Sequence, residues 1–320
     1  MNLSFLYWVS KGDAWRMKEI ILETRNLTKK YGTQNAVDHI SIQVEKGAIY
    51  GLIGKNGAGK TTFMKLISGL ANATEGEICL FGNSNENVAA EQKRIGLLIE
   101  SPGVYGDMTA FENLKIKAIG MGVYRKEKVD EILNLIGLEN VGRKKVKQFS
   151  LGMKQRLGIG LAHIGSPDFL ILDEPINGLD PQGILEVRQL IERLNKEQKI
   201  TVMISSHILE ELYKIVTHVG IIDHGKLLTQ LTKEELTNKC AKKIEIITSK
   251  PDKTAVVLEK MGIMKYSVVD SKTVCAYECL DRVQEIMTAL VKAEIPVLEI
   301  RNQNESLEDF FLQLTERGAE

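Results

Sequence analysis

A glycine-rich stretch at residues 54–62 has the residue types and the spacing of a phosphate-binding loop. It reads Gly-Lys-Asn-Gly-Ala-Gly-Lys-Thr-Thr, so a glycine is followed, after four residues, by Gly-Lys-Thr. Glycines let backbone N–H groups turn toward an anion, and the helix that follows adds the positive end of its dipole. Lys60 can reach the β- and γ-phosphates of a nucleotide, while the Thr61 hydroxyl can bind Mg²⁺. We therefore predict nucleotide binding by Gly54, Lys55, Asn56, Gly57, Ala58, Gly59, Lys60, Thr61 and Thr62.

Two carboxylates follow a short apolar run further along the chain. Residues 169–172, Phe-Leu-Ile-Leu, are followed directly by Asp173 and Glu174. Such a run is typical of a buried parallel strand, and α/β sheets bind their ligands at the carboxyl ends of these strands. We expect Asp173 to hold Mg²⁺ together with Thr61, and Glu174 to polarise the attacking water.

A second apolar run, residues 200–206, ends at His207. A single histidine at the end of a strand is usually structural. This strand, however, should deliver its carboxyl end to the same sheet edge as the phosphate-binding loop and the two acids. We therefore treat His207 as a second candidate catalytic residue.

The sequence around these motifs predicts a mixed α/β framework. Residues 48–53 read as the strand before the loop and residues 63–69 as the helix after it. Other strands are expected at 20–24, 37–44, 76–82 and 95–100, the last ending in Glu100, and residues 108–148 have helical spacing. The first two should form an antiparallel edge. Tyr31 lies between them, where it is either a strand-end tyrosine or a platform for a purine base.

The pattern changes beyond residue 239. Strands and helices alternate in the order βαββαβ over residues 243–301, and a further helix is expected at 306–315. This order predicts a small ferredoxin-like α+β domain. Its role stays open between regulation or dimer support and a passive structural part. The expected domains are thus an N-terminal extension or tail at 1–16, a nucleotide-binding domain at 17–238 and an accessory domain at 239–320.

Composition narrows the classes of function. The 320 residues suffice for two domains, and 42 basic residues balance 42 acidic ones, which gives no support for a nucleic-acid partner. Apolar runs stop short of the ~20 residues that cross a membrane. The cysteines lack the paired spacing of a zinc site and suit a reducing compartment; they are Cys79, Cys240, Cys275 and Cys279.

The motifs, taken in order, resemble those of ATP-binding-cassette ATPases over residues 20–230. The residues that carry this resemblance are the base-stacking Tyr31, the Walker A loop 54–62, Glu100 in place of the Q-loop glutamine, the signature Ser150, Leu151, Gly152, Met153 and Lys154, the Walker B pair Asp173 and Glu174, the D-loop from Asn177 to Asp180, and the switch histidine His207. The resemblance implies a P-loop NTPase core with an antiparallel β subdomain and a helical subdomain.

The same resemblance implies cofactors and partners. Members bind ATP and Mg²⁺, and two cassettes face head to tail so that each ATP lies between one P-loop and the other signature. We accordingly expect a homodimer, no nucleic acid, and transmembrane permease subunits encoded elsewhere, at the cytoplasmic face of the membrane.

Two departures from the family pattern favour a subgroup. The signature reads Ser-Leu-Gly-Met-Lys rather than Ser-Gly-Gly-Gln, and Glu100 replaces a glutamine. With the ending at 306–312, these features resemble ATPases of bacitracin-resistance and lantibiotic-immunity exporters. Exporters of other drugs or small solutes remain an alternative. A soluble cassette of translation or DNA repair is less favoured, because there is one P-loop and no long coiled coil before the signature.

Overall fold

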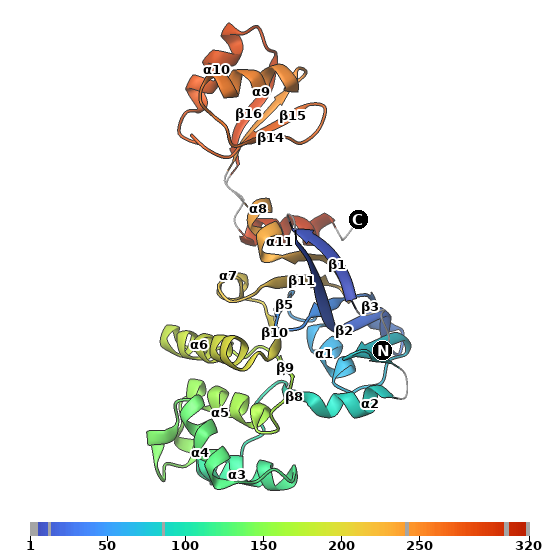
Figure 1. Cartoon of the computed structure of the whole chain (residues 1–320), viewed down its shortest axis with the longest axis vertical. Helices are drawn as coiled ribbons and strands as arrows, with labels where there is room; N and C mark the ends of the chain where they lie inside the picture. The colour runs from blue at the N-terminus through green and yellow to red at the C-terminus, as the bar shows by residue number, and fades with distance from the viewer. Residues whose placement is uncertain (1–5, 12–13, 85–86, 241–242, 304–306, 318–320) are drawn as a thin grey trace. The chain divides into compact units, whose positions relative to one another are not determined.

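The computed structural model describes residues 6–11, 14–84, 87–240, 243–303 and 307–317. The chain forms two compact units, Met1–Lys233 and Glu234–Glu320. Figure 1 shows the chain coloured from blue at the N-terminus to red at the C-terminus. The division between the units falls a few residues before the predicted boundary at 238/239. None of the described helices is long and apolar enough to span a bilayer.

An antiparallel sheet is built around one long strand, β2. Its strands are β1 (Leu6–Lys11), β2 (Ala14–Tyr31), β3 (Gln34–Ile40), β4 (Gln43–Glu45), β6 (Glu75–Leu80) and β7 (Asn83–Ser84). Strand β2 pairs with β1, β3, β4 and β6, and β6 pairs with β7, all antiparallel. The predicted antiparallel subdomain is therefore present. The segment expected as an extension or tail contributes β1, which forms a hairpin with β2.

The strand predicted at 37–44 is wrong in one respect, because it is two strands, β3 and β4. The Thr24 hydroxyl donates to Ile40 O at 3.0 Å and accepts from Ile42 N at 3.0 Å. His39, just before the break, has a left-handed φ of 53°. A side chain thus replaces the regular ladder at this point, and alternation along the sequence does not reveal such a replacement.

A second, mostly parallel sheet carries the predicted motifs. In sheet order its strands are β12 (Lys226–Thr232), β11 (His218–Asp223), β5 (Ile49–Ile53), β10 (Thr201–Ser206), β9 (Phe169–Leu172) and β8 (Ile95–Leu98). Strands β11, β5, β10, β9 and β8 run parallel, so their carboxyl ends share one edge. Every residue of β5, β9 and β10 is buried, as continuous apolar runs predict.

The helices of the first unit are positioned by their termini and by apolar packing. They are α1 (Lys60–Ile67), α2 (Val88–Glu91), α3 (Ala110–Gly120), α4 (Lys126–Leu135), α5 (Leu151–His163), α6 (Pro181–Gln198) and α7 (Leu209–Tyr213), with short 3₁₀ turns η3 (Gln92–Arg94), η4 (Glu139–Val141) and η5 (Val146–Gln148). The N-terminus of α3 has a Thr109–Glu112 capping box. Helices α3, α4 and α5 gather as a green cluster in Figure 1, which is the predicted helical region.

The second unit has the predicted order of elements after one helix that was not predicted, α8 (Lys233–Lys239). The predicted elements are β13 (Lys243–Thr248), α9 (Pro251–Lys260), β14 (Tyr266–Val268), β15 (Thr273–Ala276), α10 (Val283–Lys292), β16 (Val297–Gln303) and α11 (Leu307–Arg317). The sheet order is β14-β15-β13-β16 with antiparallel neighbours, the ferredoxin-like arrangement. Its core includes Ile246, Leu258 and Ile286. Ser306, the first residue of the predicted last helix, lies outside the described residues.

Candidate functional site

The loop at residues 54–59 turns the chain from strand β5 into helix α1. Gly57 and Gly59 have φ values of 82° and 104°, which side-chain-bearing residues rarely adopt. A Cβ atom on Gly59 would also lie 2.3 Å from Ala36 O. In the described part of the chain no side chain caps α1, so its first N–H groups can bind an anion.

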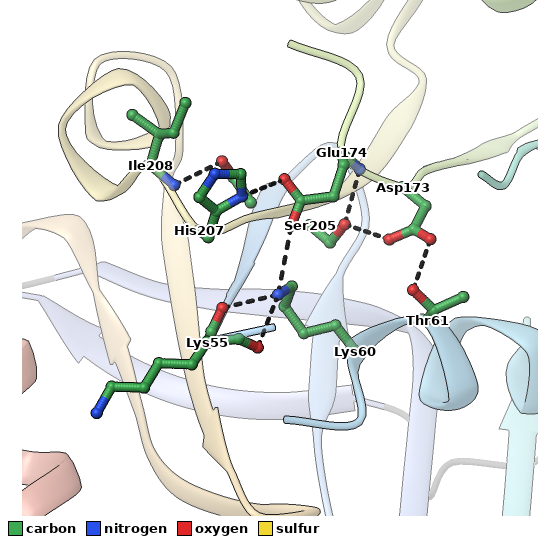
Figure 2. A network of polar contacts seen from close by, with 10 residues as sticks. Lys55, Lys60, Thr61, Asp173, Glu174, Ser205, His207 and Ile208 are labelled. Carbon is green, nitrogen blue, oxygen red and sulfur yellow. Dashed lines mark hydrogen bonds and ion pairs between the residues drawn. The ribbon is translucent and has the colours of Figure 1, made fainter. Parts of the chain in front are cut away.

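Lys60 lies across this loop with its amine directed inward (Figure 2). Its Nζ donates to Gly54 O at 2.7 Å and to Lys55 O at 3.2 Å. The same atom forms an ion pair with Glu174 Oε1 at 3.3 Å. Lys60 is buried, so the structure fixes a cation between the loop and the acid that follows β9.

Asp173 is held by two hydroxyl groups from neighbouring elements. Thr61 Oγ1 donates to Asp173 Oδ2 at 2.7 Å, and Ser205 Oγ donates to Asp173 Oδ1. The Glu174 N–H in turn donates to Ser205 Oγ at 2.8 Å. Thr61 and Asp173 thus present adjacent oxygen atoms, the donor chemistry that suits Mg²⁺ when phosphate oxygens complete its coordination.

Glu174 and His207 form a pair that can orient a water molecule and accept its proton. His207 Nδ1 lies 2.8 Å from Glu174 Oε2 (Figure 2). Glu174 has a left-handed φ of 48°, and Asn177 N donates to its carbonyl, so a tight turn directs the side chain. A carboxylate held by both an imidazole and the Lys60 amine has the arrangement of a general base with orienting partners.

A cavity of about 490 Å³ lies at the loop, within the usual range for small-ligand sites. Asp173 and His207 contact residues that line it but are not among its lining residues. Residues 56–62, Glu174 and the 55% exposed side chain of Tyr31 line it. The predicted base platform therefore lies beside the predicted phosphate-binding loop. Sequence reasoning missed the other lining residues, which are Gln34, Asn35, Ala36, His224 and Gly225.

These missed residues come from two hairpins that sequence order does not place at the loop. The β2–β3 hairpin supplies residues 34–36, and the β11–β12 turn supplies His224 and Gly225. Gly225 N donates to Ala58 O at 3.0 Å, which attaches the turn to the loop. The pattern Asp-His-Gly-Lys at 223–226 indicates a turn but not its neighbour. Ser205 was likewise read only as part of a strand.

Glu100 is not among the residues that line this cavity. Its carboxylate Oε1 lies 2.6 Å from Lys65 Nζ on helix α1, and its side chain is 67% exposed. The structure therefore places this predicted nucleotide-binding residue beside the site, in an ion pair that the sequence did not suggest.

The signature residues Ser150, Leu151, Gly152, Met153 and Lys154 also lie away from this cavity. Ser150 caps α5 by accepting from Met153 N at 3.3 Å. Asp180 caps α6 by accepting from Gly183 N at 3.0 Å. The two helix starts adjoin, since a Cβ atom on Gly152 would lie 3.6 Å from Gly183 Cα. Their contact with nucleotide stays a prediction.

Comparisons with known proteins agree with this geometry. The family model described as ABC transporter matches residues 37–177. The chain is 44% identical over 301 residues to the bacitracin transport ATP-binding protein BcrA of Bacillus licheniformis, covering 93% of this chain and 98% of that protein. It is 43% identical over 210 residues to the lantibiotic transport ATP-binding protein SrtF of Streptococcus pyogenes, covering 66% and 90%.

Solved structures resemble the first unit. One is the ADP conformation of an ATP-binding cassette of an ABC transporter, with a TM-score of 0.62 and 27% identity over 68% of this chain and 94% of that one. The match to BcrA extends along nearly the full length of both chains, so it includes the second unit as well. The chain belongs to the family of ABC transporter ATP-binding proteins, the ATPase subunits that couple ATP hydrolysis to transport.

Proposed function

We propose that this chain binds and hydrolyses Mg²⁺-ATP as a homodimer at the cytoplasmic face of the membrane, and drives an exporter that protects the cell from peptide antibiotics. The relatives named for bacitracin and lantibiotic transport support the substrate class. The observation that carries the hydrolytic function is the contact of Glu174 with both His207 and Lys60 at the loop.

Each residue of the site has a role that its position supports. Lys60 binds the β- and γ-phosphates once these replace its contacts to the loop carbonyls. Glu174 accepts a proton from the attacking water, and His207, on its other oxygen, holds the carboxylate in place. Thr61 and Asp173 would hold Mg²⁺, which supplies neutralisation of the phosphate charge when bound. Tyr31 stacks on the base.

The signature residues support a dimer. Ser150 caps a helix of 13 residues whose N-terminus can bind the γ-phosphate of a nucleotide on another subunit. Because this segment does not line the chain's own cavity, a second copy facing head to tail is the arrangement that brings the two together.

A groove between β8, α3 and α5 is the surface we assign to the membrane subunits. It has a volume of about 580 Å³ and is lined largely by apolar residues. Tyr105 at this groove is 58% exposed and Met121 is 45% exposed. The segment Ser101 to Gly103, directly after Glu100, also lines it. A membrane-subunit helix bound here would contact the segment that follows Glu100, and would therefore respond to its movement.

One substitution tests this proposal by four measurements. Glu174→Gln is nearly isosteric but cannot accept the proton, so the purified variant should bind ATP, lose turnover and elute as an ATP-bound dimer on size exclusion. Cells carrying it with the membrane subunits should become as sensitive to bacitracin and to a lantibiotic as cells without the chain.

Glu192→Gln is the matched control, because Glu192 is a helix α6 carboxylate paired with Lys196 outside the cavity. It should behave as the unchanged protein in all four measurements. Full turnover by the Glu174 variant would remove Glu174 from catalysis. Undiminished resistance in its cells would exclude the antibiotic role even if hydrolysis were lost.

A further inference from the structure

The ion pair between Lys65 and Glu100 links the P-loop helix to the segment after β8. Lys65 Nζ lies 2.6 Å from Glu100 Oε1, the distance of a charge-assisted hydrogen bond. Lys65 is half-buried, whereas the Glu100 side chain is mostly exposed. The lysine side chain is thus the more restrained of the two, and its ammonium group sets the position of the carboxylate.

Both members of this pair lie close to the predicted Mg²⁺ ligands. Lys65 is four residues after Thr61 in helix α1, so the two side chains share one face. Strand β8 pairs with β9 in a register that sets Leu98 opposite Leu172, and Asp173 N donates to Leu98 O at 2.7 Å. Glu100 therefore leaves the same sheet edge as Asp173, one strand away.

The electrostatic surroundings of Lys65 agree with this proximity. The pKa of the Lys65 ammonium is raised above its ordinary value, first by its hydrogen bond to Glu100 and further by the charges of Glu100, Asp173 and Tyr31. With Lys65 attached, the Glu100 carboxylate adds no net charge to this edge. The ion pair is in this respect equivalent to the neutral glutamine that the family pattern has at this position.

We propose that Lys65 is a positioning residue that ties the Glu100 carboxylate to helix α1 and keeps it from the Mg²⁺ that Thr61 and Asp173 would hold. This proposal rests on the proposed binding of Mg²⁺ and nucleotide at the loop. Removing Lys65 releases a negative charge next to the metal, whereas removing both charges restores the neutral state.

The test uses the full chain and the fluorescent nucleotide N-methylanthraniloyl-ADP, so no hydrolysis intervenes. The Mg²⁺ concentration that gives half-maximal nucleotide binding is measured for the unchanged protein, Lys65→Met, Glu100→Gln and the double variant. Lys65→Met should lower this midpoint about three- to tenfold, because an unpaired carboxylate attracts the cation. The double variant, which carries neither charge, should stay within about twofold of the unchanged protein. Glu100→Gln leaves the Lys65 cation unpaired and should raise the midpoint, but by less than Lys65→Met lowers it, because a free carboxylate can bind the metal directly.

Two further variants make the result specific. Lys65→Arg keeps the cation and should keep the original midpoint. Lys46→Met breaks a comparable surface pair, Lys46 with Glu19 at 2.9 Å, and should not change the Mg²⁺ midpoint. Thermal unfolding of each variant confirms that it is folded.

The outcomes separate this inference from the proposed function. An unchanged Mg²⁺ midpoint in Lys65→Met would overturn the positioning role. The role would also be overturned if Lys65→Met shifted the midpoint equally with Glu100 present and in the Glu100→Gln variant. If the unchanged protein bound the nucleotide without any Mg²⁺ dependence, the proposed metal site itself would fail.

Discussion

Ser205→Ala should lower the free energy of unfolding more than the loss of the neighbouring hydroxyl, Ser206→Ala. Ser205 lies near the carboxyl end of β10, next to Asp173 and Glu174, which follow β9. The Ser205 side chain is fully buried and serves two partners, donating to Asp173 and accepting from Glu174 N at 2.8 Å. Its neighbour Ser206 is equally buried, and among the described residues its hydroxyl accepts from Ile208 N alone, at 2.9 Å. The two serines therefore form a matched pair in one strand that differs in its hydrogen-bond partners.

The magnitudes follow from these partners. A hydrogen bond to a buried carboxylate contributes about 1.5–3 kcal/mol, and leaving a buried amide unpaired costs about 1–3 kcal/mol. Ser205→Ala should thus lower the free energy of unfolding by about 2.5–6 kcal/mol. Ser206→Ala leaves only the Ile208 amide without its partner and, counted in the same way, should cost about 1–3 kcal/mol. In a unit of this size, 1 kcal/mol corresponds to a shift in Tm of about 2–4 °C.

Differential scanning calorimetry of the full chain measures both variants. The transition of the first unit is recognised because Mg²⁺-ATP raises its Tm, whereas the second unit need not respond. We expect a drop of roughly 5–24 °C for Ser205→Ala and a smaller drop, roughly 2–12 °C, for Ser206→Ala. Equal shifts in the two variants would refute the view that Ser205 supports Asp173 and Glu174 together.

Two other substitutions test the site directly. Lys60→Ala should abolish ATP binding in equilibrium titrations, because the cation on the β- and γ-phosphates is lost; retained micromolar affinity would contradict the assignment of the loop. Glu100→Gln should keep ATPase activity within about a factor of ten, a barrier change of about 1.4 kcal/mol, since Glu174 already supplies a base. It should impair antibiotic resistance in cells more severely, and a collapse of hydrolysis in the purified variant would instead make Glu100 catalytic.

The parts of the site that sequence predicts are those encoded locally. The loop at 54–62 is contiguous, and its glycines, lysine and threonine have roles fixed by spacing alone. Asp173 and Glu174 were recognisable because they end a buried apolar run. That these segments meet at one sheet edge followed from the parallel order of strands, and the contacts of Lys60 and Thr61 with them agree with that expectation.

The parts that sequence did not predict depend on contacts between distant segments. Ser205 looks like any polar residue near the end of a strand until β9 lies beside it. The Lys65–Glu100 ion pair joins residues 35 positions apart. The break between β3 and β4 arises because the Thr24 hydroxyl inserts from the adjacent strand, which leaves the apolar alternation of the segment intact.

The contact between Gly59 and Ala36 also affects how this protein can be recombined with its relatives. The carbonyl oxygen of Ala36 occupies the position that a Cβ atom on residue 59 would need, and the β11–β12 turn closes the same spot with the Cα of Gly225. The nucleotide loop is therefore shaped by backbone atoms of two other segments. A chimera that takes its antiparallel sheet from another cassette must also keep the backbone path at residue 36, or the loop will change shape although none of its own residues has been altered.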